Sequence, residues 1–196
     1  MRHPYQILLP LLSLFWVRVD LTDLFPLKIP VEIVDIRDGD TMAVRTGNRV
    51  LRVRLSRIDA PELHQKYSAI DRDAGIDARD CVRKLAIKLA TLSIEGFDLY
   101  HRILGNVDDI NFLAVKNGCS GLYPHARFDS VREKMEFLRA LLKARELRLG
   151  VWKFGGYQTP KVWRKISKRS GHQRWRPRPH SRVTYRPGRK RARREY

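Results

Sequence analysis

Three short runs of strand-forming residues follow one another near the start of the chain, and this feature limits the fold more than any other. The runs cover residues 31–36, 41–45 and 49–55. An Asp-Gly-Asp sequence at 38–40 and a Thr-Gly-Asn sequence at 46–48 separate them, and both are typical of turns. Strands joined by such short turns usually pair as hairpins. The sequence therefore predicts a small antiparallel sheet or barrel.

Helical patterns follow these strands. Apolar residues recur at helical spacing over 73–92, and two further strands are predicted over 93–100 and 103–107. A short helix is predicted over 109–117, where Gly118 would end it. Strands, a helix, more strands and more helices in this order indicate an α+β fold.

A longer helix is predicted over 130–149. Ser130 and Glu133 have the spacing of a capping box, in which the two side chains satisfy free amide groups of the first turn. Gly150 follows the last predicted helical residue and would end the helix. An apolar stripe is expected to face the core, and its residues are Val131, Met135, Leu138, Leu142 and Leu149.

Charge divides the chain into a folded body and a basic tail. Of the net charge of +19, residues 157–196 contribute +14, because they hold 4 Lys and 11 Arg against one acid, Glu195. Prolines interrupt this segment and it has no periodicity, so a disordered Arg-rich tail is predicted over 157–196, after a folded domain over 31–156. Such a charge argues against an ordinary neutral metabolic enzyme and indicates a polyanionic partner.

The aromatic residues of the tail favour nucleic acid as that partner. Trp163, Trp175, Tyr157 and Tyr185 are interleaved with Lys and Arg. Guanidinium groups bind phosphates and aromatic rings stack on bases, so binding is expected to depend on salt and to be largely indifferent to sequence. Weak contact with an anionic membrane is the alternative.

Residues 1–30 precede the predicted domain and contain an apolar stretch over 7–17, broken by Pro10. As a helix this stretch would span roughly 16 Å, less than the ~30 Å hydrocarbon core of a membrane. The small-residue pattern of a signal-peptide cleavage site is missing. A signal, a short anchor and an extension packed on the body remain open. Accordingly the protein is either exported or attached to the cell envelope through this stretch, or cytoplasmic.

Cys81 and Cys119 are the two cysteines of the chain. They form no CxxC motif and no cluster with His, which argues against a zinc finger or a disulfide scaffold. One disulfide between them is an open alternative, and two free thiols are the simpler interpretation.

The end of the third predicted strand carries side chains suited to chemistry. Apolar and polar residues alternate up to Leu55, but the next apolar residue, Ile58, comes three positions later. A bulge or bend near Ser56 would explain this shift, and it would bring Arg54 and Asp59 to one face. Pro61 then takes the chain out of the strand, so that Glu62 can point back to the same place.

Asp40, at the start of the second predicted strand, can lie close to Asp59 in a hairpin-based sheet. Two carboxylates with no His or Cys beside them suit a hard cation, Ca²⁺ or Mg²⁺. Arginines near such a cation suit a phosphate. The combination matches phosphodiester cleavage, in which a metal polarises the phosphoryl oxygen, arginines stabilise the transition state and Glu62 positions or deprotonates water.

The order of these residues resembles the staphylococcal nuclease (thermonuclease) family. The resemblance covers about 31–152 and is carried by segments in the family's order. These segments are DGDT at 38–41, RLSRIDAPE at 54–62, DLYHRIL at 98–104, NFLAVKNG at 111–118 and LGVW at 149–152.

The resemblance implies a five-stranded OB-type β-barrel with about three helices. It implies a Ca²⁺-dependent nuclease acting on DNA, RNA or both, with products that carry 5′-hydroxyl and 3′-phosphate ends. No obligate protein partner is inferred from the sequence. The implied site residues are Arg54, Glu62 and Arg102 for catalysis, Tyr100 and Tyr123 for substrate binding, and Asp40, Asp59 and the carbonyl of Ala60 for the metal.

His101 departs from the family pattern, because a glycine usually precedes the second catalytic arginine. If this position needs a positive φ, histidine costs about 1 kcal/mol and would shift Arg102. A non-catalytic nucleic-acid-binding module on the same barrel is therefore the alternative function, and a membrane-tethered processing nuclease is a third.

Overall fold

The computed structural model describes residues 26–169 of the chain. Its strands are β1 (Leu27–Ile36), β2 (Thr41–Thr46), β3 (Arg49–Leu55), β4 (Ile58–Asp59), β5 (Leu89–Phe97), β6 (Ile103–Val107) and β7 (Gly121–Leu122). Its helices are α1 (Ala74–Leu85), α2 (Ile110–Lys116), α3 (Val131–Glu146) and α4 (Pro160–Arg169), with a short 3-10 helix at Gly150–Trp152.

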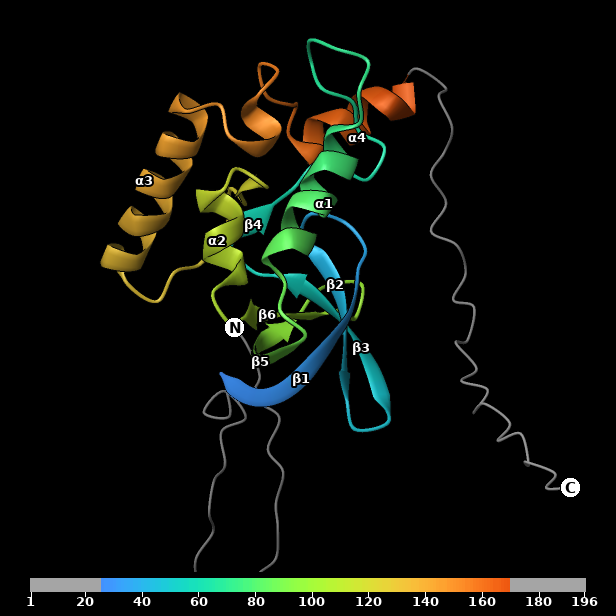
Figure 1. Cartoon of the computed structure of the whole chain (residues 1–196), viewed down its shortest axis with the longest axis vertical. Helices are drawn as coiled ribbons and strands as arrows, with labels where there is room; N and C mark the ends of the chain where they lie inside the picture. Colours follow the sequence, from blue (N-terminus) through green and yellow to red (C-terminus); the bar gives the residue numbers. More distant parts are fainter. Residues whose placement is uncertain (1–25, 170–196) are drawn as a thin grey trace, which may run out of the picture.

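Five strands close a barrel in the order β1-β2-β3-β6-β5. β1, β2 and β3 form the predicted antiparallel meander, whereas β3 and β6 are parallel. β4 leaves the barrel and pairs with β7. Figure 1 shows the helices gathered on one side of the barrel. The predicted α+β fold with a five-stranded barrel is confirmed, with four helices instead of three.

The barrel encloses the main core. On β3 the alternation holds, since Val53 and Leu55 are buried while Arg52 is exposed. Leu92 from β5 and Val107 from β6 are also fully buried. The core therefore fixes the register of β3, and with it the side of the strand on which Arg54 lies.

Helix α1 is shorter than predicted. The apolar spacing over 73–92 predicted one helix, but α1 ends at Leu85, and Leu89 and Leu92 belong to β5. β5 pairs with β1 over six residues and closes the barrel. The hydrogen bonds of this pairing outweigh the local helical pattern, because a barrel leaves no free strand edge.

Helix α3 begins after Ser130, as predicted, but only the serine half of the capping box forms, because Glu133 bonds to the amide one residue before the N-cap. The Ser130 hydroxyl accepts a hydrogen bond from Glu133 N, and the Glu133 carboxylate accepts one from Asp129 N. These contacts satisfy two amide groups at the start of the helix.

The predicted core-facing stripe of α3 is wrong for three of its residues. Val131 is 79% exposed, and Met135 and Leu142 are also exposed. Phe137 is buried instead, with its ring edge-on to those of Phe112 and Phe128. The aromatic ring fills the space against α2 better than the aliphatic stripe would, so it selects the buried face.

Both ends of the folded domain extend beyond the predicted boundaries. β1 begins at Leu27 instead of residue 31. The tail was predicted to be disordered from 157, but Tyr157 packs on Trp152, with ring centroids 5.2 Å apart, and α4 follows. The predictions for 1–25 and 170–196 lie outside the described residues. Within 26–169 no helix is long and apolar enough to cross a membrane.

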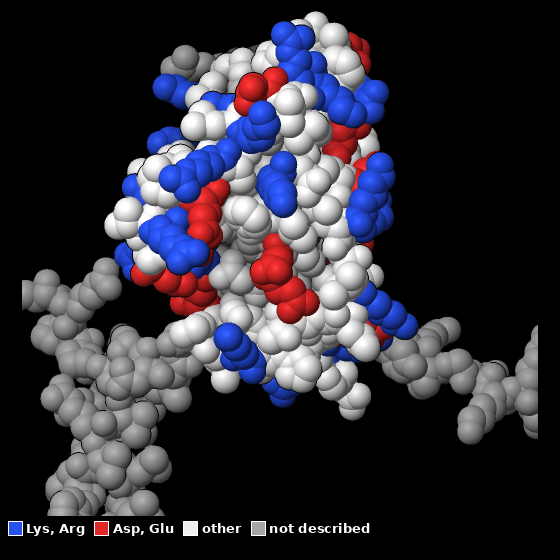
Figure 2. Space-filling view, turned by 60° about the vertical axis from the view of Figure 1, so that its left-hand side comes forward, with Lys and Arg blue, Asp and Glu red and all other residues white. Residues whose placement is uncertain are grey.

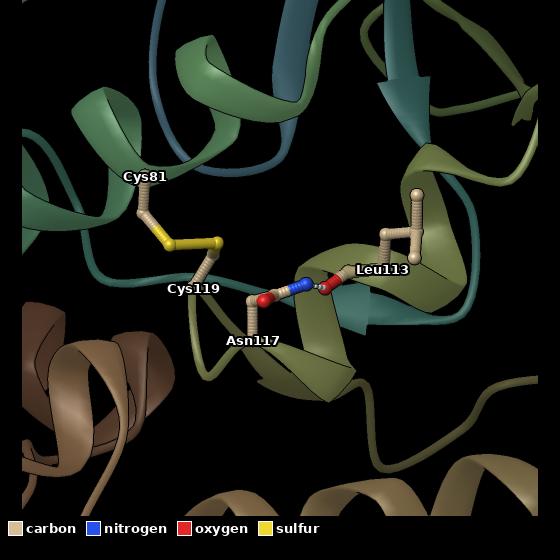
Figure 3. The surroundings of a disulfide bond; sticks show 4 residues. All are labelled: Cys81, Leu113, Asn117 and Cys119. Atoms are coloured by element: carbon tan, nitrogen blue, oxygen red, sulfur yellow. Dashed lines mark hydrogen bonds between the residues drawn. A yellow bond between two sulfur atoms is a disulfide. The ribbon is translucent and has the colours of Figure 1, made fainter.

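Cys81 and Cys119 form a disulfide, so the interpretation as two free thiols is wrong (Figure 3). The bond joins α1 to the residue that follows α2 and Gly118, with 5.4 Å between the two Cα atoms. The cysteines are 38 residues apart in sequence, so only the packing of α1 beside α2 brings them together.

The described surface carries charges of both signs. Figure 2 shows Lys and Arg side chains spread over one face, with groups of Asp and Glu between them. The excess of positive charge in the sequence is concentrated in 157–196, and residues 157–169, which include α4, are the part of that segment whose structure is described.

Candidate active site

The turn before β2 lies directly against the residues that follow β4. A Cβ atom at Gly39 would be 2.6 Å from the Ala60 Cβ and 2.8 Å from the Ala78 Cβ. Only glycine permits this close approach of the turn to α1. As a result Asp40 is buried, and its Oδ2 accepts a hydrogen bond from Ala60 N at 3.0 Å.

Arg54 lies between the two predicted metal-binding carboxylates. Its Nη2 is 3.1 Å from Asp40 Oδ2 and 3.4 Å from Asp59 Oδ1. Its Nη1 donates to the carbonyls of Leu55 and Ile58, each at 2.9 Å. The structure thus brings Arg54 and Asp59 to one face, as the sequence predicted, places Asp40 beside them, and fixes the guanidinium from both sides.

The predicted irregularity after β3 provides this arrangement. Arg57 has φ of 68°, so the chain bends between Leu55 and Ile58 and re-enters a strand at β4. The buried Arg57 side chain is held by the carboxylates of Glu95, Asp129 and Glu133. This ion cluster ties the bend to β5 and to the start of α3, and the left-handed conformation is maintained despite its cost.

The acidic groups of the site perturb one another. Burial, together with the nearby Asp40 carboxylate, raises the pKa of Asp59 to about 6, although Arg54 and Arg164 oppose the shift. Burial and Asp40 likewise raise the pKa of Asp38 to about 8. Asp38 Oδ1 accepts a hydrogen bond from Asp40 N and holds the turn. An accumulation of buried carboxylates is relieved by a bound cation.

Arg102 reaches the same site from the start of β6. Its Nη1 donates to the Thr41 hydroxyl at 3.2 Å, and that hydroxyl donates to Asp40 Oδ1 at 3.0 Å. Asp98 orients the arginine, with Oδ2 2.7 Å from Arg102 Nε. Burial disfavours the Asp98 carboxylate, but hydrogen bonds from Arg102 and Tyr100 still hold its pKa below the usual value.

His101 has φ of 58°, in the left-handed region. Histidine is strained at this position only if the backbone has a positive φ, and the structure shows that it has. The strain lies in the residue immediately before Arg102, where the backbone must turn so that Asp98 can accept from the Arg102 amide.

Glu62 extends from the loop after β4 toward α4. Its Oε1 lies 2.6 Å from Arg164 Nη1. Its amide donates to Gln65 Oε1 at 3.1 Å, and a Cβ at Gly75 would lie 1.8 Å from its carbonyl oxygen, so α1 packs directly on this backbone. Burial raises the pKa of Glu62, and Arg164 opposes that shift.

The two predicted substrate-binding tyrosines are at the rim. Tyr100 is 78% exposed, and the Arg102 guanidinium lies 5.7 Å from its ring centroid. Tyr123 is 45% exposed and follows β7; its amide donates to Arg57 O, and its ring contacts His125. Tyr100 thus lies beside a predicted catalytic arginine, whereas the contacts of Tyr123 are with residues outside the predicted site.

The donor set limits which metal could bind. Among residues 26–169, no group of three or more His, Cys, Asp or Glu side chains is placed to hold an ion. The carboxylates of Asp40 and Asp59 are the side-chain donors that this cluster offers to a cation, and backbone oxygen and water would have to complete its shell. Oxygen donors of this kind fit a hard cation such as Ca²⁺ or Mg²⁺ and disfavour a soft one.

Three further residues also contact the site: Thr41 and Arg164, which were assigned no role from the sequence, and Tyr157, which was predicted to be a base-stacking residue of the tail. Thr41 joins Asp40 to Arg102, as described above. The Tyr157 hydroxyl donates to Asp59 O and accepts from Gly121 N, each at 3.0 Å, and its burial and the Asp59 charge raise its pKa. Arg164 contacts Glu62. Thr41 stands within the DGDT motif, but Tyr157 and Arg164 carry no local signal.

The family and the relatives that this chain resembles are described as nucleases. A sequence profile of the family described as staphylococcal nuclease homologue matches residues 52–154. An uncharacterized endonuclease of Haemophilus influenzae is 31% identical over 146 residues, which is 72% of this chain and 76% of that protein. A micrococcal nuclease of Shigella flexneri is 31% identical over 151 residues, which is 70% of this chain and 81% of that protein.

Proposed function

Since the chain belongs to the family of staphylococcal nuclease homologues, we propose that it is a calcium-dependent nuclease that hydrolyses phosphodiester bonds in DNA, RNA or both. The observation that carries the proposal is the cluster of Asp40, Arg54 and Asp59, to which Thr41 connects Arg102. Two arginines beside the buried Asp40 and the half-buried Asp59 suit a phosphate diester bound together with a metal ion.

Asp40, Asp59 and the carbonyl of Ala60 would hold Ca²⁺. The bound ion would supply Lewis acidity toward a phosphoryl oxygen and neutralise the two carboxylates. Arg54 then no longer has to compensate Asp40 and Asp59 alone, and its guanidinium can donate to the phosphate. Because two carbonyls fix its other nitrogen, the donor is already oriented when substrate arrives.

Arg102 would stabilise the negative charge that develops on the phosphate oxygens in the transition state. Asp98 and Thr41 hold this guanidinium at the edge of the site. The exposed ring of Tyr100 beside it offers a stacking surface for a base or sugar next to the scissile phosphate.

Glu62 would position the attacking water and accept its proton. Its raised pKa makes the carboxylate a better base than an exposed glutamate. The water oxygen bonds to phosphorus while the bond between phosphorus and the 5′ oxygen breaks. The 5′ oxygen takes up a proton from solvent water and leaves as a hydroxyl, the proton held by Glu62 returns to solvent, and the phosphate remains on the 3′ oxygen.

A non-catalytic nucleic-acid-binding module is the second candidate, and one observation favours it. The strained backbone at His101 directly precedes Arg102, and a displacement of about 1 Å in a catalytic group can reduce a rate by about 100-fold. In such a module the arginines would bind phosphates without cleavage.

Cleavage assays on single-stranded DNA, duplex DNA and RNA separate the two candidates. We expect cleavage with Ca²⁺ and none with EDTA, and a loss of about 100-fold or more in Glu62→Gln and Arg102→Ala. Glu136→Gln is the matched control, because Glu136 forms an exposed ion pair on α3. Salt-sensitive binding without cleavage by the unmodified protein would favour the binding module.

We also propose that the protein functions in an oxidising compartment, outside the cytoplasm. Disulfides such as Cys81–Cys119 persist in oxidising environments and are rare in the cytosol. The apolar stretch over 7–17 is compatible with export. Cell fractionation tests this location, with alkylation of free thiols in each fraction; a reduced protein in the cytosolic fraction would contradict it.

A further inference from the structure

Helix α4 carries an arginine into the candidate active site. Arg164 Nη1 lies 2.6 Å from Glu62 Oε1, the carboxylate assigned to the attacking water. We propose that Arg164 is an additional substrate-binding residue, which pairs with Glu62 in the free protein and exchanges it for a backbone phosphate of bound nucleic acid. This inference rests on the proposed nuclease function and adds a substrate contact to the same site.

The segment before α4 sets the position of the helix. Three consecutive residues bind the loop over 59–68: Gly156 O accepts from an amide, the Tyr157 hydroxyl donates to a carbonyl, and Gln158 O accepts from a side-chain amide. Pro160 then begins the helix, where its fixed φ and missing N–H are favourable. α4 is therefore held beside the site by contacts that do not involve Arg164.

The pair between Arg164 and Glu62 is suited to exchange. The Arg164 side chain is 56% exposed and that of Glu62 is 33% exposed, and hydrated ion pairs of this kind contribute little to stability. The hydrogen bond uses the Nη1 atom of the guanidinium, whereas a phosphate can accept from two guanidinium nitrogens at once. A substrate phosphate is thus the better partner, and the exchange leaves Glu62 free to bind water.

The charges along α4 favour the same partner. Lys161 and Lys165 are exposed, and with Arg164 they have the i, i+3, i+4 spacing of one helix face. Residues 157–169 contain no acidic side chain. A row of cations that begins at the candidate site suits the repeating phosphates of one nucleic-acid strand, because a strand bound to Arg164 would also pass this helix face.

Steady-state cleavage of a short single-stranded oligothymidylate in Ca²⁺ tests the proposal. For Arg164→Ala we expect KM to rise about tenfold, the loss of one charge-assisted phosphate contact, with kcat changed less than about twofold. Over roughly 50 to 200 mM salt, the dependence of log KM on log salt should flatten by about 0.7. Arg164→Lys keeps the charge but cannot donate two parallel hydrogen bonds. Its KM should therefore lie between those of the unmodified protein and Arg164→Ala.

Equilibrium binding of the same oligonucleotide in EDTA, followed by fluorescence anisotropy, gives a readout without turnover. In EDTA we expect the unmodified protein to bind most tightly, Arg164→Lys less tightly and Arg164→Ala least tightly. Arg132→Ala is the matched control. Arg132 also forms an exposed ion pair with a glutamate, Glu136, but this pair lies on α3 and includes no residue of the candidate site. If the unmodified protein cleaves nothing, the nuclease proposal fails, but the binding assay still decides whether Arg164 contacts phosphate.

Two results would overturn the proposal. A rise in kcat with unchanged KM for Arg164→Ala would show that α4 only inhibits Glu62. A fall in kcat with unchanged KM, unchanged affinity in EDTA and an unchanged salt slope would show that Arg164 only orients Glu62.

Discussion

Removal of the Cys81–Cys119 disulfide should destabilise the protein by an amount that follows from the length of the loop that the bond closes. The bond closes a loop with a sequence separation of 38 residues. The loop-closure entropy of a chain of that length corresponds to about 4 kcal/mol at 25 °C. The perturbation is the double variant Cys81→Ala/Cys119→Ala, in which no unpaired thiol can react.

Urea unfolding of the full chain, followed by circular dichroism and tryptophan fluorescence, measures this change. We expect the double variant to lose about 2 to 4 kcal/mol and to show a larger m-value, because the unfolded chain is no longer cross-linked. The unmodified protein with reductant should behave in the same way. A variant that loses less than about 1 kcal/mol and keeps its m-value would refute this expectation, since the cross-link would then not constrain the unfolded state.

Three further predictions concern the site. His101→Gly should stabilise the protein by about 1 kcal/mol in thermal unfolding, because glycine adopts the left-handed φ of 58° without strain; lower stability would place the native φ elsewhere. Tyr157→Phe should cost about 1 to 3 kcal/mol and reduce cleavage, because Asp59 O and Gly121 N lose their partner; equal melting temperatures would contradict this. Because the pKa of Asp59 is raised to about 6, protonation stabilises the metal-free protein below pH 4, and this contribution is lost as the pH rises through 6. Asp59→Asn in EDTA should therefore gain stability relative to the unmodified protein between pH 4 and pH 8, by up to about 3 kcal/mol, and a difference that does not change with pH would refute the shift.

The predictable part of the site lies within one short segment. Arg54 and Asp59 are five residues apart, and the break in alternation after Leu55 placed them on one face. The structure shows that bend at Arg57 and a shared contact of Arg54 with Asp40 and Asp59. The prediction succeeded because strand geometry and a local bulge determine the directions of side chains over so few residues.

Predictions failed where a local pattern was compatible with two structures. The apolar spacing over 73–92 suits a helix, but pairing with β1 converts its end into β5. On α3, Val131 and Met135 have core-like spacing, yet Phe137 is the residue that packs against α2. Periodicity identifies an apolar face, but it does not identify the neighbour that will cover it.

The sequence by itself therefore determined the meander of β1 to β3, the cap of α3 and the chemistry available in the cluster of Asp40, Arg54 and Asp59. Only the tertiary structure decided the pairing of Cys81 with Cys119 and the contact of Arg164 with Glu62, which are separated by 38 and 102 residues. Turns, helix caps and strand alternation are set largely by neighbouring residues, and these patterns can be read directly. Contacts between distant segments depend on how the barrel closes and where the helices dock, and no local pattern specifies them.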